Sequence, residues 1–179
     1  MARPGRVVLA GAVTGLLLVA FGKSMQNSSS TPAASVVPKS IDIPSLDLEA
    51  PLMKLGLSKD GEVELPPYEK PKMAGWYSGS AVPGERGASV IIGHVDTKTA
   101  PAVFYKLRQL RKGETVKVER SDGKVVSFKV DAIEQVSKDH FPARRVYVDE
   151  GLKLVTCGGK FDYSRGEYVD NIIVYASRA

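Results

Sequence analysis

The sequence is poor in the residues that form cross-links and metal sites. It has one cysteine and two histidines among 179 residues. A single cysteine cannot form a disulfide within the chain, so Cys157 is either a small buried apolar residue or a free thiol kept for its reactivity. One thiol and one well-placed imidazole also do not fill the four-ligand shell of zinc. We therefore expect no metal and no other cofactor.

An excess of charge of one sign is also missing from most of the chain. The formal net charge is +5, but Arg3, Arg6 and Lys23 precede every acidic residue. The chain after Lys23 has 22 basic and 20 acidic residues, a net charge of +2. This balance is that of an ordinary solvated surface and argues against a nucleic-acid partner.

The longest uncharged apolar run lies at the N-terminus. Residues 7–22 carry no charge and follow a short basic stretch. The run is shorter than the ~20 residues that span a bilayer comfortably, although ~17 suffice. We predict an uncleaved signal-anchor or transmembrane segment at 1–22, a flexible Ser/Pro-rich tether at 23–39 and one domain at 40–179. The basic end would lie in the cytoplasm and the domain outside the cell membrane.

The domain has the pattern of a β protein. Residues 40–57 alternate between apolar and polar in short pieces, and an Asp-Gly turn at 122–123 separates two strand-like segments, as in a hairpin. Apolar, β-branched runs at 88–94, 152–157 and 170–177 are suited to central strands. The sequence predicts a mainly β domain, a closed or nearly closed antiparallel barrel with one or two short helices.

Helical spacing occurs in one segment of the domain. In residues 101–113, Phe104, Leu107 and Leu110 recur at helical intervals, and Gly113 is a typical stop. We expect a short helix there.

Two reactive side chains follow apolar runs and lie next to glycine. Cys157 ends the run 152–157 and precedes Gly158, and His94 follows Gly93. Strand ends that open into loops are common sites of chemistry, because the strand fixes position while the loop admits a ligand. A thiol beside an imidazole indicates acyl transfer through a thioester, provided that a donor stabilises the oxyanion. His140, in a charged stretch, is expected to be a solvated surface residue.

These residues resemble the signatures of a known family. "LVTCGG" at 154–159 resembles the Cys motif of sortases, the cysteine transpeptidases of Gram-positive cell surfaces, and "VIIGHVD" at 90–96 resembles their histidine strand. Residues 74–97, 102–118 and 168–176 are similar to the actinobacterial class E or F branch, with class F closer. The resemblance extends from about Ile41 to Ala176.

The resemblance implies an eight-stranded β-barrel and a set of site residues. Cys157 would attack the Thr-Gly bond of an LPxTG-like sorting signal, with His94 as acid and base. Thr156 would line the substrate pocket, and Gly158 permits close approach of the substrate backbone. Trp76 either forms a peptide-binding rim or packs in the core. The implied partners are surface proteins bearing the signal and an amine acceptor from a peptidoglycan precursor or a pilin.

The sequence departs from the family pattern at the arginine. Sortases place an arginine on the last barrel strand, where this chain has Asn171, and the nearest arginine is Arg165 in the preceding loop. Arg165 is the favoured oxyanion donor, with Asn171 as the alternative.

Two other functions stay open at this stage. An L,D-transpeptidase also uses Cys and His, although those enzymes keep the two residues close together in sequence. A non-catalytic, membrane-tethered barrel that binds peptides is the alternative outside enzymes, and its cysteine would be buried and unreactive.

Overall fold

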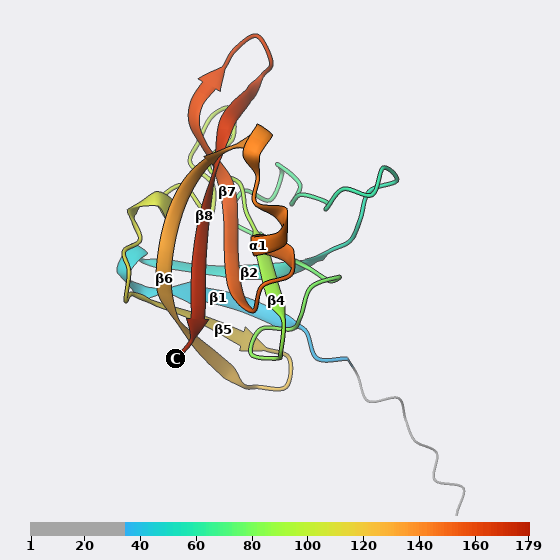
Figure 1. Ribbon diagram of the computed structural model, residues 1–179, viewed down its shortest axis with the longest axis vertical. Coiled ribbons are helices and arrows are strands. Elements are labelled where there is room, and N and C mark those ends of the chain that lie inside the picture. The colour runs from blue at the N-terminus through green and yellow to red at the C-terminus, as the bar shows by residue number, and fades with distance from the viewer. Residues whose placement is uncertain (1–34) are drawn as a thin grey trace, which may run out of the picture. The chain divides into compact units, whose positions relative to one another are not determined.

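Eight strands close into a β-barrel in the computed structural model, which describes residues 35–179 (Figure 1). Neighbours around the barrel follow the order β1-β2-β3-β4-β7-β8-β6-β5. The strands are β1 (Pro38–Ile43), β2 (Leu48–Leu55), β3 (Ala74–Tyr77), β4 (Ala88–Ile92), β5 (Thr115–Arg120), β6 (Val125–Ser137), β7 (Gly151–Asp162) and β8 (Glu167–Arg178). The predicted closed, mainly β barrel is confirmed.

The helical elements are short. They are the 3-10 turns η1 (Pro44–Leu46), η2 (Leu107–Gln109) and η3 (Lys138–His140) and the α-helix α1 (Ala143–Tyr147). Within residues 35–179, no helix has the length and apolar character needed to cross a membrane. The predicted signal-anchor at 1–22 and most of the tether lie outside the described residues, and β1 begins at Pro38, just before the predicted boundary of the domain.

Alternation along the strands divides the apolar residues between two cores. The larger core contains buried side chains from all eight strands, among them Phe128, Leu152 and Leu154, and fills the barrel. The smaller core lies on the outer side of β4, β7 and β8, where Val155 and Ile173 pack with Val146 of α1. Full burial of one such side chain contributes roughly 1.5–3 kcal/mol. The outer core therefore fixes α1 to the sheet.

The strand pairings bring two chain segments together at one end of the barrel. β4 pairs with β7 in parallel, with Ile92 opposite Val155. β7 and β8 form a long antiparallel hairpin that extends beyond the other strands (Figure 1). The predicted hairpin around Asp122-Gly123 is confirmed as β5 and β6.

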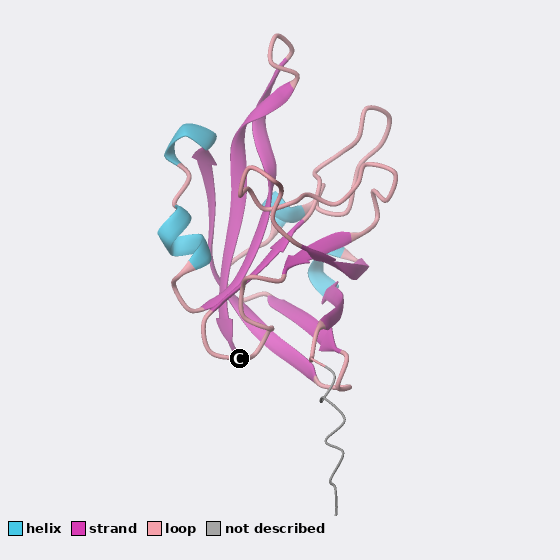
Figure 2. Cartoon of the chain, turned by 90° about the vertical axis from the view of Figure 1, so that its right-hand side faces the viewer, coloured by secondary structure: helices cyan, strands magenta, loops and turns pink. Residues whose placement is uncertain are grey.

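The predicted position of the helix was wrong. Residues 101–113 form turns and the three-residue η2 rather than a helix. Phe104, Leu107 and Leu110 are buried in the larger core, so their spacing reflects packing of a turn. The only α-helix of the described chain, α1, forms instead in the charged stretch before β7. Figure 2 shows the helical turns of that stretch on one side of the strands.

Gly159 is required for two reasons, its positive φ and the lack of space for a side chain. Gly159 has φ of 76°, and a Cβ there would lie 2.7 Å from Cγ of Asp170. The Asp170 carboxylate in turn accepts a hydrogen bond from Gln135 at 2.6 Å. Gly123 has a similar φ of 78° with no atom near the same position.

We predict that Gly159→Ala lowers the free energy of unfolding by about 2–4 kcal/mol, because the strain of a positive φ adds to a clash. Gly123→Ala, with the same strain but open space, should cost only about 1–2 kcal/mol. Denaturant unfolding of both variants measures the difference. Equal losses would show that Asp170 moves aside without cost.

Candidate active site

His94 follows the end of β4, and Cys157 lies within β7 beside it; the predicted strand end at Cys157 was wrong, because β7 continues to Asp162. The parallel register of β4 and β7 sets Ile92 beside Val155, and the N–H of Gly93 donates to the carbonyl of Val155 at 3.1 Å. Continuation of this register for two residues brings His94 level with Cys157. The two residues are 63 positions apart in the sequence, and the fold places them at the same edge of the sheet.

His94 is buried and held by the segment between β2 and β3. Its Nε2 lies 2.6 Å from the carbonyl oxygen of Pro66, and the ring of Tyr68 stacks on the imidazole with centroids 4.2 Å apart. A carbonyl oxygen only accepts, so Nε2 carries a proton and donates it. The sequence analysis did not identify Pro66 and Tyr68, because nothing in their local pattern points to a histidine 26 or more residues away.

Cys157 is partly buried among charged groups. Its side chain lies on the outer face of β7, the face that Val155 presents to the smaller core. Burial raises the pKa of the Cys157 thiol, Lys138 opposes that shift, and Glu167 and Asp96 add to it. A thiol with a raised pKa is a poor nucleophile at neutral pH. The site therefore needs a group that favours the thiolate.

The two residues that flank Cys157 are buried. Thr156 is 3% exposed, and its hydroxyl has no hydrogen-bond partner among the described residues. Strand alternation directs it away from the face of Cys157. At Gly158 a Cβ would come within 2.7 Å of Ile172, so this position accepts only glycine without rearrangement. The pocket-lining role of Thr156 stays a prediction.

Trp76 packs inside the barrel. Its side chain is 5% exposed in the larger core, and its indole N–H donates to the carbonyl of Ala81 at 3.1 Å. Of the two alternatives that the sequence left open for Trp76, the structure therefore shows the core rather than the rim.

The two candidate oxyanion donors occupy different places on the hairpin. Asn171 on β8 pairs directly with Cys157 on β7, so their side chains share a face. Arg165 lies in the turn between the strands and forms an ion pair with Glu167 at 2.9 Å. Five residues of strand, about 15 Å, separate Cys157 from the start of that turn at Asp162. Glu167 also binds Lys138 at 2.7 Å.

A hydrogen bond between Tyr168 and Asp96 lies beside the site. The hydroxyl of Tyr168 on β8 donates to the carboxylate of Asp96, which follows His94, at 2.5 Å. This bond raises the pKa of Tyr168 to about 12. The sequence analysis did not identify this bond, since only the fold joins residues 72 positions apart.

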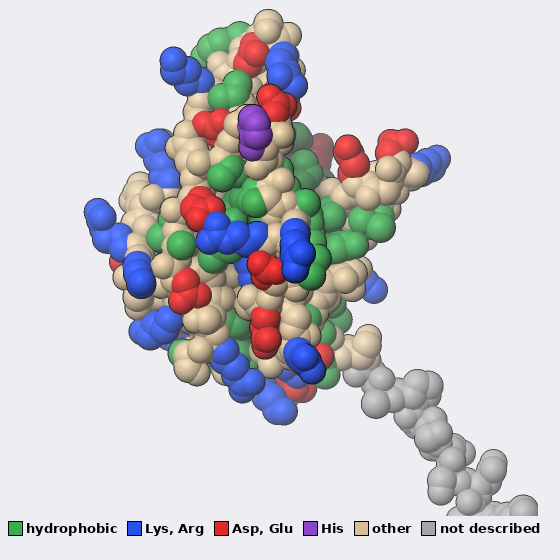
Figure 3. All heavy atoms as spheres, viewed as in Figure 1, with side chains coloured by type: hydrophobic (Ala, Val, Ile, Leu, Met, Phe, Trp, Pro, Cys, Tyr) green, Lys and Arg blue, Asp and Glu red, His purple; other side chains and the backbone are tan. Residues whose placement is uncertain are grey.

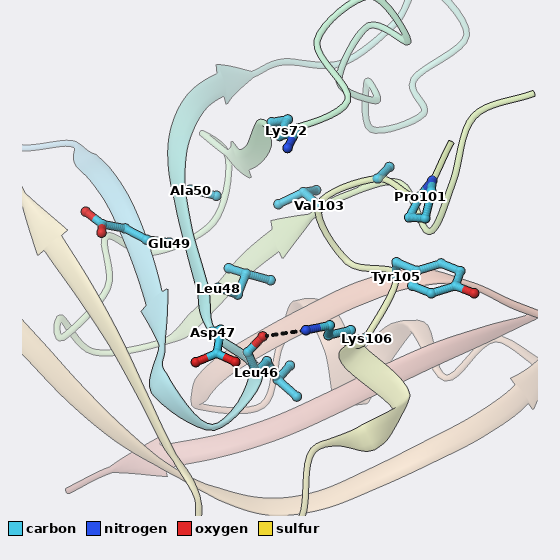
Figure 4. A pocket seen from close by; sticks show the side chains of 11 residues that line it. Leu46, Asp47, Leu48, Glu49, Ala50, Lys72, Pro101, Val103, Tyr105 and Lys106 are labelled. Atoms are coloured by element: carbon cyan, nitrogen blue, oxygen red, sulfur yellow. Dashed lines mark hydrogen bonds between the residues drawn. The ribbon is translucent and has the colours of Figure 1, made fainter. Parts of the chain in front are cut away.

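Other surface features do not coincide with these residues. A hollow of about 320 Å³ lies between the β1–β2 turn and the segment before η2, where Lys106 donates to the carbonyl of Leu46 at 3.3 Å (Figure 4). None of the predicted site residues lines it. Basic and acidic side chains are interspersed over the face shown in Figure 3, in agreement with the balanced charge of the sequence.

The bond between Tyr168 and Asp96 gives a pH-dependent prediction. Because the carboxylate accepts from the protonated phenol, Asp96→Asn should lower the pKa of Tyr168 from about 12 towards its ordinary value of 10.0. The bond stabilises the fold below pH 10, and this contribution is lost as the pH rises towards 12. Ultraviolet titration of the wild type and Asp96→Asn, each compared with Tyr168→Phe, measures the shift. An unchanged titration in Asp96→Asn would contradict the assignment.

Comparison with known proteins agrees with this geometry. A family model for the Sortase domain matches residues 41–179. Similar structures are sortase C of Streptococcus pneumoniae (26% identity, TM-score 0.58, 79% of this chain and 68% of that chain) and sortase C-1 of Actinomyces oris (24%, 0.60, 78% and 72%). Sortase C1 of Streptococcus agalactiae is similar too (22%, 0.58, 79% and 66%).

The chain thus spans about two thirds of the length of these structures. No curated protein matches it. The family model covers most of the chain, including β7, which carries Cys157, and β4, which His94 follows. This protein therefore belongs to the sortase family, whose members are cysteine transpeptidases.

Proposed function

We propose that the protein is a membrane-anchored cysteine transpeptidase that cleaves an LPxTG-like sorting signal and transfers the acyl group to an amine. The observation that carries the proposal is the parallel pairing of β4 and β7, which aligns His94 with Cys157. A thiol and an imidazole at one sheet edge are the pair that acyl transfer through a thioester needs.

The first half of the reaction forms a thioester. His94 takes the proton of the Cys157 thiol and becomes an imidazolium; the thiolate attacks the threonine carbonyl carbon, and the carbonyl oxygen becomes an oxyanion. Collapse of this intermediate breaks the Thr-Gly bond, and the departing glycine nitrogen takes a proton from the imidazolium of His94. In the second half an amine gives its proton to His94 and attacks the thioester, and the Cys157 thiolate leaves and takes that proton back from His94.

The Pro66 contact limits what His94 can do at rest. Its Nε2 donates to the carbonyl of Pro66, and Tyr68 covers one face of the ring. Proton transfer to a leaving amine through Nε2 requires that contact to open. Entry of substrate would therefore displace the segment between β2 and β3.

Asn171 is the oxyanion donor that the geometry supports. Directly paired residues of antiparallel strands have Cβ atoms about 4.5–5.5 Å apart, so the Asn171 amide is within reach of an intermediate on Cys157. Arg165 would have to leave Glu167 and fold the turn back along the hairpin.

The sortase class, the membrane location and the partners in this proposal are supported by the sequence. Residues 74–97, 102–118 and 168–176 support the actinobacterial class E or F type, with class F closer. The basic start and apolar run of residues 1–22 support a single-pass anchor with the barrel outside the cell membrane. The partners would be surface proteins with an LPxTG-like signal and an amine from a peptidoglycan precursor or a pilin.

The decisive test is mass spectrometry of the full chain, solubilised in mild detergent, with LPxTG-type peptides and an added amine. We expect a thioacyl adduct on Cys157 and a transpeptidated product. Both should be missing in Cys157→Ala, and His94→Gln should lower turnover by about 10²-fold or more.

An absent adduct with several such peptides, together with a slowly alkylated thiol, would favour the non-catalytic barrel. Circular dichroism of the wild type and both variants serves as the folding control, so that loss of product is not confused with loss of structure.

A second pair of variants separates the oxyanion donors. Asn171→Ala should lower kcat by about 10²-fold, the usual cost of losing one donor, while Arg165→Ala should keep a near-normal kcat. Steady-state kinetics with the peptide that forms the adduct decides between them. The reverse pattern would assign the role to Arg165, as the sequence favoured.

A further inference from the structure

Lys138 shares a sheet face with the thiol of Cys157. The register sets Cys157 opposite Asn171 and Asn171 opposite Val136, so the three side chains lie in a row on one face. Ser137 pairs with Asp170, and Lys138 follows at the end of β6, one row further towards the hairpin tip. Because successive side chains of a strand point to opposite faces, the Lys138 side chain lies on the same face as the Cys157 side chain.

The position of Lys138 is fixed from two sides. Its Nζ donates to Glu167 of β8 at 2.7 Å, and the side chain is only 31% exposed. The Ser137 hydroxyl caps the turn by accepting from the N–H of Asp139, and Phe141 packs against the smaller core. A lysine in this setting keeps its charge near one place, unlike a free surface lysine.

Charged groups of both signs lie around the Cys157 thiol. Lys138 favours the thiolate, whereas Glu167 and Asp96 disfavour it. Among the other titratable groups on the neighbouring elements, Tyr168 pairs with Asp96, Asp170 with Gln135, His94 with Pro66, and Arg165 with Glu167, while Lys160, Asp139 and His140 are exposed. Lys138 is the cation that combines partial burial with a place on the face of Cys157.

We propose that Lys138 is a positioning residue that stabilises the thiolate of Cys157, held in place by Glu167 across the β6–β8 pairing. The proposal rests on the proposed role of Cys157 as nucleophile. It assigns to a lysine on the β6–β7 connection a task distinct from oxyanion binding, because it concerns the resting thiol before substrate is bound.

A purely structural ion pair would behave differently. Partly exposed Lys–Glu pairs contribute little to stability, so a structural role would appear, if at all, as a small change in unfolding. A thiolate-stabilising role moves the pH at which the thiol becomes reactive. These two readouts are independent.

The test is the pH dependence of Cys157 alkylation by iodoacetamide in the full chain, without any sorting peptide. Lys138→Gln should raise the midpoint by about 0.5–1 pH unit, since a cation on the same sheet face as the thiolate is lost. Lys138→Arg keeps the charge and should stay close to the wild type. Lys129→Gln, at the far end of β6, is the control with the same change in net charge.

The outcomes separate the two proposals. A midpoint in Lys138→Gln equal to that of the wild type would overturn the role of Lys138, whatever the peptide assays show. A shifted midpoint without a thioacyl adduct would support Lys138 and refute the sorting reaction. An equal shift in Lys129→Gln would also overturn the proposal, because it would reveal an effect of net charge. Thermal unfolding of all three variants confirms that each is folded.

Discussion

The site depends on the parallel pairing of β4 with β7. Their other neighbours, β3 and β8, run antiparallel to them, so among the pairings of β4 and β7 only this one sets two strands of the same direction side by side. His94 follows one strand and Cys157 lies within the other. An antiparallel pairing would place the end of one strand beside the start of the other and separate the two residues by the length of β4.

Parallel neighbouring strands need a long connection between them. Here the connection also supplies residues around the site. Between β4 and β7 the chain forms η2, β5, β6, η3 and α1. α1 packs on the outer face, where Arg145 forms an ion pair with Glu134 at 2.6 Å and lies 3.9 Å above the ring of Tyr175. The same connection that makes the parallel pairing possible thus encloses the thiol and brings Lys138 to it.

The sequence allowed the barrel to be predicted because its strands carry strong local signals. β-branched runs in β4, β7 and β8 and the Asp-Gly turn before β6 each act over a few residues. The segment 101–113 was misread because three buried side chains in turns can share the spacing of a helix. The place of Trp76 was left open for a related reason: an aromatic residue beside glycine is compatible with a rim and with a core, and only the closed barrel distinguishes them.

The surroundings of the reactive pair could not be predicted, because they arise from contacts across the fold. Pro66 meets His94, Tyr168 meets Asp96, and Lys138 meets Glu167, each from a different strand connection or edge. Two features oppose reactivity at rest: burial raises the pKa of the Cys157 thiol, and the His94 imidazole already donates to Pro66. In the proposed mechanism, substrate opens the Pro66 contact, while Lys138 acts in the opposite direction to burial and favours the thiolate. A resting site of this kind limits side reactions of an exposed thiol, since alkylation and oxidation both follow thiolate character.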